Sequence, residues 1–134
     1  MTRSALDATC HDGRVEALAE LVESLPDGVV ATDPATVATN RHDWSRDVGA
    51  GTPVAVVRAE DAGQVQVAVR WAARHSVPVV PRGAGSGLSG GASGVDGGIV
   101  LSLERMRAIE VDTGCQVAVV EPGAFNAEVK VAAR

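Results

Sequence analysis

Glycine dominates the segment from residue 82 to residue 98, RGAGSGLSGGASGVDGG, and this segment constrains the fold more than any other. Eight of its residues are glycine, and Leu88 and Val95 are its only sizeable hydrophobes. Because glycine loses more conformational freedom on folding than any other residue, so dense a run opposes order unless something specific requires it. The usual requirement is a backbone with positive φ angles or one that lies against a ligand. Successive amide N–H groups in such turns bind anions, phosphate above all.

Two apolar segments flank this loop: VPVVP at residues 77–81 before it and IVLSL at residues 99–103 after it. Both have the β-branched composition that is typical of strands. A flexible linker is the alternative interpretation of the glycines, but a linker hinged between two core strands is the less favoured one. The sequence therefore indicates a shaped loop that binds phosphate.

The apolar spacing before the loop predicts a β-α-β unit. A first amphipathic helix is expected at residues 12–25 and a short strand at residues 29–30. A polar stretch then leads to a strand at residues 54–57, a helix capped by Asp61 and a strand at residues 77–80, with the two strands parallel and the crossover right-handed. The inner face of the second helix is expected to carry Val65, Ala68, Val69, Ala72 and Ala73.

Further strands are expected after the loop, at residues 99–103, 107–111 and 116–120, the last two joined as a hairpin. The fold class is therefore α+β. Residues 124–134, AFNAEVKVAAR, are typical of the opening of a helix with Asn126 as its cap. Because no C-cap, glycine or polar tail follows, the terminus is interpreted as an interruption, through either a truncated gene product or a longer reading frame.

Composition bounds the class of protein. The 134 residues fit one domain, and 46% hydrophobic with 22% charged residues is ordinary for a soluble globular chain. A formal net charge of −5 and few aromatic residues argue against nucleic acid and against an anionic membrane surface. No signal peptide and no membrane span are visible, which predicts a cytoplasmic protein. Cys10 and Cys115 lie far apart without metal-ligand spacing, so reduced thiols and no metal are expected.

Three kinds of glycine-rich phosphate-binding loop can be distinguished by sequence. A Walker A loop needs a terminal Gly-Lys-Ser/Thr, and no lysine lies near this loop, so it is excluded. Residues 85–90, GSGLSG, satisfy the Rossmann pattern GxGxxG, but that motif must open a helix, whereas this segment runs into a strand. A loop that surrounds the phosphates with backbone amides, without a helix, is the favoured solution.

The segment PRGAGSGLSGG at residues 81–91 resembles the pyrophosphate loop of the PCMH-type FAD-binding domain in the vanillyl-alcohol oxidase superfamily. The likeness is greatest to the FAD-linked subunit of glycolate oxidase and to D-lactate dehydrogenases. The flanks PVAVVR (53–58), GGIVLSLERM (97–106) and VVEPG (119–123) are similar to those of the family, and WSRD (44–47) corresponds to a short motif before the domain.

The resemblance covers residues 29–134, which would form the first part of the PCMH-type domain, truncated. Residues 1–28, which include the predicted first helix, would form an N-terminal helical segment before it. Family members are several times longer, with a second FAD subdomain and a substrate-binding cap domain. The resemblance therefore assigns no catalytic residue to this chain.

The resemblance also implies FAD as the cofactor, bound non-covalently because no histidine or cysteine lies in the loop. The amides of residues 82–88 would bind the FAD pyrophosphate, Ser86 and Ser89 would add hydroxyl hydrogen bonds, and the glycines would allow close approach. Pro122 and Gly123 would lie beside the flavin. The expected cofactor-binding residues are Pro81, Arg82, Gly83, Ala84, Gly85, Ser86, Gly87, Leu88, Ser89, Gly90, Gly91, Pro122 and Gly123.

The activity that the resemblance implies is oxidation of a 2-hydroxy acid such as glycolate or D-lactate. Hydride would pass to the flavin and then to an electron acceptor, which can be a partner protein. The alternative is a flavin- or nucleotide-binding piece without activity of its own. The histidines (His11, His42 and His75) are scattered and are expected to be structural. The Arg82 side chain has two interpretations that stay open, namely balancing phosphate charge or pairing with an acid such as Asp96.

Overall fold

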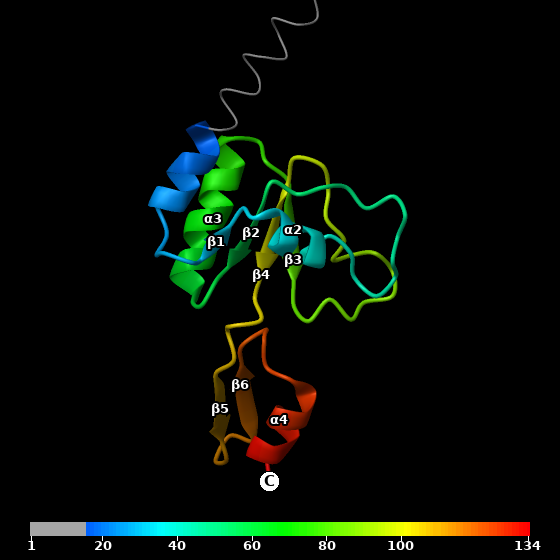
Figure 1. Cartoon of the computed structure of the whole chain (residues 1–134). Helices are drawn as coiled ribbons and strands as arrows, with labels where there is room; N and C mark the ends of the chain where they lie inside the picture. Colours follow the sequence, from blue (N-terminus) through cyan, green and yellow to red (C-terminus); the bar gives the residue numbers. More distant parts are fainter. Residues whose placement is uncertain (1–15) are drawn as a thin grey trace, which may run out of the picture.

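The computed structural model describes residues 16–134, which form a four-stranded sheet with helices and, beyond it, a smaller hairpin unit (Figure 1). Residues 16–23 are helical. The elements that follow are β1 (Val30–Ala31), α2 (Pro34–Asn40), β2 (Ala55–Arg58), α3 (Ala62–Arg74), β3 (Val79–Arg82), β4 (Ile99–Ser102), β5 (Ile109–Asp112), β6 (Val117–Val120) and α4 (Asn126–Ala132). The α+β class is confirmed. The part of the predicted first helix at residues 12–15, with Cys10 and His11, lies outside the described residues.

The strand order in the main sheet is β1-β2-β4-β3. Both β2 and β3 run parallel to β4, and β1 pairs antiparallel with β2. The predicted strands of the β-α-β unit are therefore parallel, but β4 lies between them rather than the two being neighbours. The glycine-rich loop joins β3 to β4. Parallel neighbours need a crossover of a dozen or more residues, usually a helix, and here this loop takes the place of that helix.

Both faces of the sheet are covered, which explains why its strands are continuously apolar. One face packs against α3 and the helix that ends at residue 23, and the residues fully buried there include Leu21, Ala55, Val57, Ala68 and Ile99. The other face packs against α2 through Val37, Val56 and Val100. Alternate residues of β2 and β4 thus enter two separate cores, as the pleat of a strand requires.

Helix α3 begins as predicted, because the Asp61 side chain accepts a hydrogen bond of 2.8 Å from the amide of Gln64. Its inner face was predicted only in part. Ala68 and Ala72 are buried, but Val69 and Ala73 are exposed, so their assignment to the inner face was wrong. Trp71 takes that place instead: it is 2% exposed, and its Nε1 donates to the carbonyl oxygen of Ala17 at 2.7 Å. The large indole therefore determines which face of α3 packs against the core.

Helix α2 was not predicted, since its sequence was included in a polar stretch. Asp33 is its N-cap and accepts a hydrogen bond of 2.9 Å from the amide of Thr36, and Pro34 stands in the first turn. An N-cap aspartate followed by proline at the first helical position is an established start signal. Only Val37 of this short helix is buried, so an apolar periodicity is missing.

Strands β5 and β6 form the predicted antiparallel hairpin, with Ile109 opposite Val120. The Asp112 carboxylate accepts hydrogen bonds from the amides of Gly114 and Cys115 and so shapes the turn. The prediction of Asn126 as a helix cap was wrong. Phe125 is the N-cap of α4, and its amide donates to the Glu128 carboxylate at 2.8 Å. Within residues 16–134, no helix has the length and apolarity needed to cross a bilayer.

Candidate cofactor-binding site

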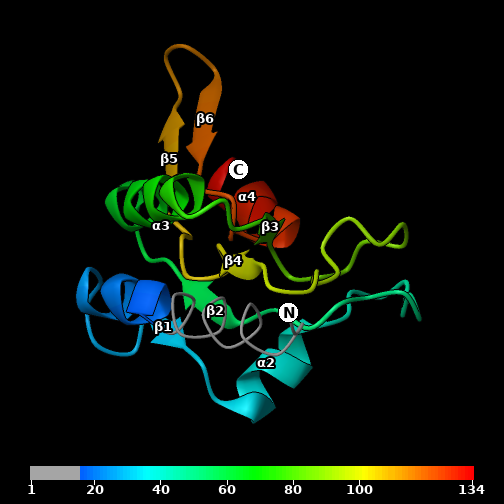
Figure 2. The ribbon, with the colours of Figure 1, turned by 90° about the horizontal axis from the view of Figure 1, so that it is seen from above.

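The glycine-rich loop leaves β3 at the carboxyl end of that strand and lies beside the segment that follows α2. Figure 2 shows the two segments projecting together from one side of the sheet. Backbone hydrogen bonds hold them together: Gly51 donates to Gly94 at 2.8 Å, and Gly94 donates to Arg41 at 2.8 Å. In open α/β sheets, the region outside the carboxyl ends of the strands is where ligands bind.

The backbone amides of the loop fall into two groups. Those of residues 92–94 have acceptors: Ala92 donates to an Asp43 carboxylate oxygen, Ser93 to the Gly90 carbonyl and Gly94 to the Arg41 carbonyl. Those of residues 83–91 donate to no acceptor within the described part of the chain. Backbone N–H groups that are buried inside a protein almost always donate to an acceptor. This run of free donors is therefore available to solvent or to an anionic ligand.

Within residues 83–91, Gly85 and Gly90 are glycines that the fold of the protein itself requires. Gly85 has a φ of +66° and Gly90 a φ of +79°, a region that side chains disfavour. A Cβ at Gly85 would also overlap the Arg82 guanidinium.

Three other glycines of the loop have room for a side-chain carbon. A Cβ at Gly83 or Gly87 would lie 3.9 Å or 3.7 Å from its nearest neighbour, and at Gly91 no atom lies within 4 Å. The protein's own packing does not explain glycine at these three positions. An open surface lined by free amides fits a diphosphate group, and FAD contains one.

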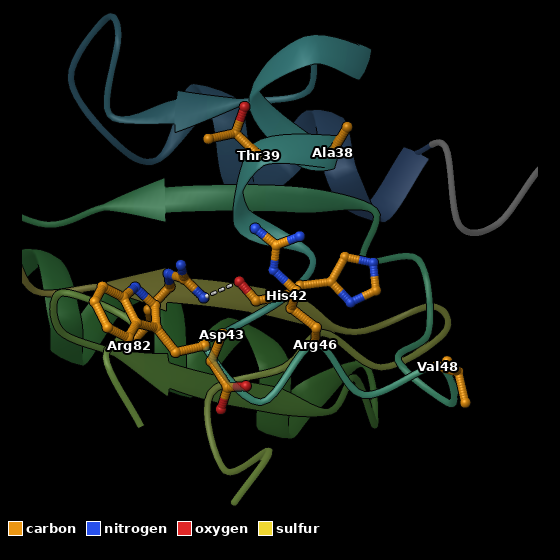
Figure 3. Close-up of a pocket in the computed structure, with 8 residues that line it drawn as sticks. Ala38, Thr39, His42, Asp43, Arg46, Val48 and Arg82 are labelled. Carbon is orange, nitrogen blue, oxygen red and sulfur yellow. Dashed lines mark hydrogen bonds between the residues drawn. The ribbon is translucent and has the colours of Figure 1, made fainter. Parts of the chain in front are cut away.

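The Arg82 side chain is buried, with 8% of the residue exposed, and lies inside the fold beneath the loop. Its Nη1 donates to the carbonyl oxygen of His42 at 3.0 Å, drawn in Figure 3, and to that of Ala92 at 3.2 Å. Asp96 does not pair with it and instead accepts from the amide of Thr52 at 2.6 Å. Of the two interpretations left open by the sequence, the pairing with Asp96 is therefore wrong.

Asp43 belongs to the site, although the sequence did not single it out. It is 4% exposed, and one carboxylate oxygen accepts from the amide and hydroxyl of Ser45, at 2.9 and 2.5 Å, and from the Ser93 hydroxyl at 3.2 Å. The other oxygen accepts from the Ala92 amide at 3.3 Å. The Ser45 hydroxyl is the main cause that lowers the pKa of this carboxyl below its ordinary value. The bond from the Ser45 amide is an Asx turn, which an aspartate in a polar stretch could have signalled, but the contacts with Ala92 and Ser93 have no local signal.

The remaining predicted residues lie mostly at the surface. Pro81, Ala84, Ser86, Leu88, Ser89 and Pro122 are exposed. Pro122 lies beside the start of the loop, with its carbonyl oxygen 3.9 Å from the Cβ position of Gly83. Gly123 is half-buried and donates to the Met106 carbonyl at 2.7 Å, and a Cβ there would overlap the Leu103 carbonyl. Glycine at position 123 is thus required by backbone packing.

A pocket of about 760 Å³ opens beneath the loop, on the side of α2. Its lining shares only Arg82 with the predicted cofactor-binding residues and otherwise comprises Ala38, Thr39, His42, Asp43, Trp44, Arg46 and Val48 (Figure 3). The pocket is therefore not the surface that carries the free amides. His75 lies elsewhere, where its Nε2 pairs with the Glu20 carboxylate at 2.9 Å, a structural contact.

Comparison with known proteins identifies the family. A sequence model of the FAD binding domain matches residues 53–134, which include both the loop and the Pro122–Gly123 segment. The D-2-hydroxyglutarate dehydrogenase of Stutzerimonas stutzeri (strain A1501) is 35% identical over 117 residues, covering 87% of this chain and 24% of the relative. The glycolate oxidase subunit GlcD of Bacillus subtilis (strain 168) is 35% identical over 75 residues, covering 55% of this chain and 16% of the relative.

The fold of this chain is also similar to that of solved structures. A crystal structure of p-cresol methylhydroxylase with substrate bound superposes with a TM-score of 0.74 at 24% identity, covering 90% of this chain and 24% of that one. This chain thus spans at most about a quarter of the length of these proteins. The matched family model, the relatives' names and the shared architecture agree with the predicted resemblance. The chain belongs to the FAD binding domain family of the PCMH type, whose cofactor is FAD.

Proposed function

We propose that the loop amides of residues 83–91 bind the pyrophosphate of FAD. The observation that carries the proposal is the unbroken run of amide donors without an acceptor in residues 16–134. Gly83, Gly87 and Gly91 support it, since no atom lies closer than 3.7 Å to the Cβ position of any of them, so the protein's own packing does not require glycine there. Ser86 and Ser89 are exposed on the same loop and would add hydroxyl donors, whereas Pro81 has no N–H and would contribute only shape.

The residues would play different parts around the cofactor. Arg82 would hold the loop from inside, because its side chain is buried beneath the loop rather than directed at solvent. Pro122, exposed beside Gly83, would border the cofactor where it leaves the loop. FAD supplies the hydride acceptor when bound, and the chain supplies binding and orientation. Attachment would be non-covalent.

We further propose that the chain serves an oxidoreductase that acts on a 2-hydroxy acid. The two relatives compared above are named for D-2-hydroxyglutarate and glycolate, both of which are 2-hydroxy acids. D-Lactate belongs to the same class. Electrons would then pass to an acceptor, which can be a partner protein. Because the chain spans 24% and 16% of these relatives, we expect residues 1–134 to bind FAD without oxidising the acid by themselves.

The binding proposal is tested by titrating the chain into FAD and recording flavin fluorescence polarisation. ADP, which carries the pyrophosphate without the flavin, should compete with FAD, and riboflavin, which lacks it, should not. Competition by riboflavin but not by ADP would refute pyrophosphate recognition by the loop. No binding of FAD at any accessible concentration would refute the proposal as a whole.

The activity proposal needs a separate assay. The FAD-loaded chain is mixed with D-2-hydroxyglutarate, D-lactate or glycolate under anaerobic conditions and without an added electron acceptor, and bleaching of the flavin absorbance is recorded. We expect binding without bleaching. Bleaching by a 2-hydroxy acid would show that these 134 residues suffice for the half-reaction, which would overturn the expectation of a non-catalytic piece.

A further inference from the structure

We infer that Asp43 and Arg82 form a buried clasp that sets the conformation of the cofactor loop, so both are positioning residues. The inference rests on the proposed function of residues 83–91. Arg82 stands where the chain enters the loop from β3, and Ala92 and Ser93 stand just after the free amides. The clasp thus joins the two ends of the segment that we propose to bind pyrophosphate.

Both backbone polar groups of Ala92 are bonded to the clasp. Its N–H donates to an Asp43 carboxylate oxygen at 3.3 Å, and its carbonyl oxygen accepts from Arg82 Nη1 at 3.2 Å. Arg82 Nη1 also reaches the His42 carbonyl, next to Asp43 in the chain. One hydrogen-bond network therefore joins the end of the loop, the Arg82 side chain and the segment that contains Asp43.

Ser93 closes the network on the aspartate side. Its hydroxyl donates to Asp43 at 3.2 Å, and the Asp43 amide lies 3.5 Å from the Ser93 oxygen. One step further along the chain, the Trp44 amide donates to the Gly85 carbonyl at 3.0 Å. The segment 42–44 therefore contacts the loop at Gly85, Ala92 and Ser93. None of these contacts uses an amide from residues 83–91.

The two charges are buried without forming an ion pair. Within residues 16–134, no carboxylate oxygen lies within 4.0 Å of an Arg82 nitrogen, and Asp43 is paired only with neutral donors. Burying a charge is costly unless hydrogen bonds replace its water. The network supplies those bonds to both carboxylate oxygens and to Arg82 Nη1, so a loop conformation that broke them would leave buried charges unpaired.

The test compares Asp43→Asn with Asp112→Asn. Both replace a carboxylate that accepts hydrogen bonds from two backbone amides, but Asp112 lies in the β5–β6 hairpin. With glycine labelled with nitrogen-15, amide exchange is measured by NMR in the FAD-free protein. We expect the Gly94 amide, which donates to the Arg41 carbonyl beside the clasp, to exchange at least about tenfold faster in Asp43→Asn than in the wild type, and to stay unchanged in Asp112→Asn. Unchanged exchange in Asp43→Asn would overturn the inference whether or not FAD binds.

FAD titration of the same variants separates the inference from the function. We expect the Kd for FAD to rise by about tenfold in Asp43→Asn and to stay within about twofold in Asp112→Asn. A wild-type chain that binds no FAD would refute the proposed function and leave the NMR result to decide on the clasp. An unchanged Kd in Asp43→Asn would refute the positioning role. If Asp43→Asn fails to fold, Ser93→Ala, which removes one hydroxyl of the clasp, takes its place with the same readouts.

Discussion

The Arg82 guanidinium fills the space beneath Gly85, so that a side-chain carbon on Gly85 would overlap it. The guanidinium is buried and is held by the carbonyl oxygens of His42 and Ala92, so it is not free to swing away. The Gly85 carbonyl also accepts a hydrogen bond of 3.0 Å from the Trp44 amide. A loop that looks entropically free in sequence is thus anchored at its third residue after β3.

Gly85→Val should abolish retention of FAD. Its positive φ alone costs at least about 1 kcal/mol for a β-branched residue, and the overlap with Arg82 displaces the loop. Gly28→Val is the matched control, because Gly28 has a φ of +79° and no atom within 4 Å of its Cβ position. The control should show the backbone strain in urea denaturation but retain FAD. A Gly85→Val preparation as yellow as the wild type would contradict the prediction.

Gly91→Ala should separate ligand proximity from folding. The position has a negative φ and open surroundings, so the free energy of unfolding should change by less than about 0.5 kcal/mol. If FAD lies against the backbone there, the added methyl group should raise its Kd. Calorimetry of FAD binding and urea denaturation measure the two effects. Full FAD affinity in Gly91→Ala would place the cofactor away from this residue.

Trp71→Ala should destabilise the chain by about 3–5 kcal/mol, the usual cost of emptying the site of a buried tryptophan. Trp71→Phe keeps most of the ring but leaves the Ala17 carbonyl without its donor, and we expect a loss of about 1–3 kcal/mol. Urea unfolding followed by circular dichroism provides the measurement. A loss in Trp71→Ala below about 1 kcal/mol would show that the helix at residues 16–23 does not depend on this indole.

Acid should destabilise the fold in a defined window. Hydrogen bonds from Ser45 lower the pKa of Asp43, and those from Thr36 lower the pKa of Asp33. A carboxyl with a lowered pKa in the folded state stabilises the fold fully above its unfolded pKa, about 3.9, and loses that contribution as pH falls through the folded value. Urea midpoints should therefore fall between about pH 5 and pH 2. Asp33→Asn should flatten part of this slope, and an identical slope in that variant would contradict the assignment.

Local signals explain which elements were predictable. Asp61 predicts the start of α3, because aspartate is a favoured N-cap residue. The hairpin turn at Asp112 is predictable because aspartate and glycine are favoured in turns. The prediction for the inner face of α3 was wrong at Val69 and Ala73. Small apolar residues occur on several sides of this helix, so the sequence does not determine which side is buried. The packing of Trp71 beside Ala17 determines it. That packing exists only once the first helix has docked.

The features of the site likewise fall into those that the sequence predicts and those that depend on the tertiary structure. Glycine density, the missing lysine and the flanking strands are properties of the chain alone, and they predict a shaped loop between two strands that binds phosphate. The family came from the resemblance of residues 81–91 and their flanks, and the matching family model confirms it. Phosphate binding by the loop stays a prediction. The burial of Arg82, the part played by Asp43 and the distinction between free and paired amides depend on residues about 40 to 50 positions apart meeting in space. Such contacts arise when β4 inserts between β2 and β3, a choice made by the burial of whole strands rather than by any local motif.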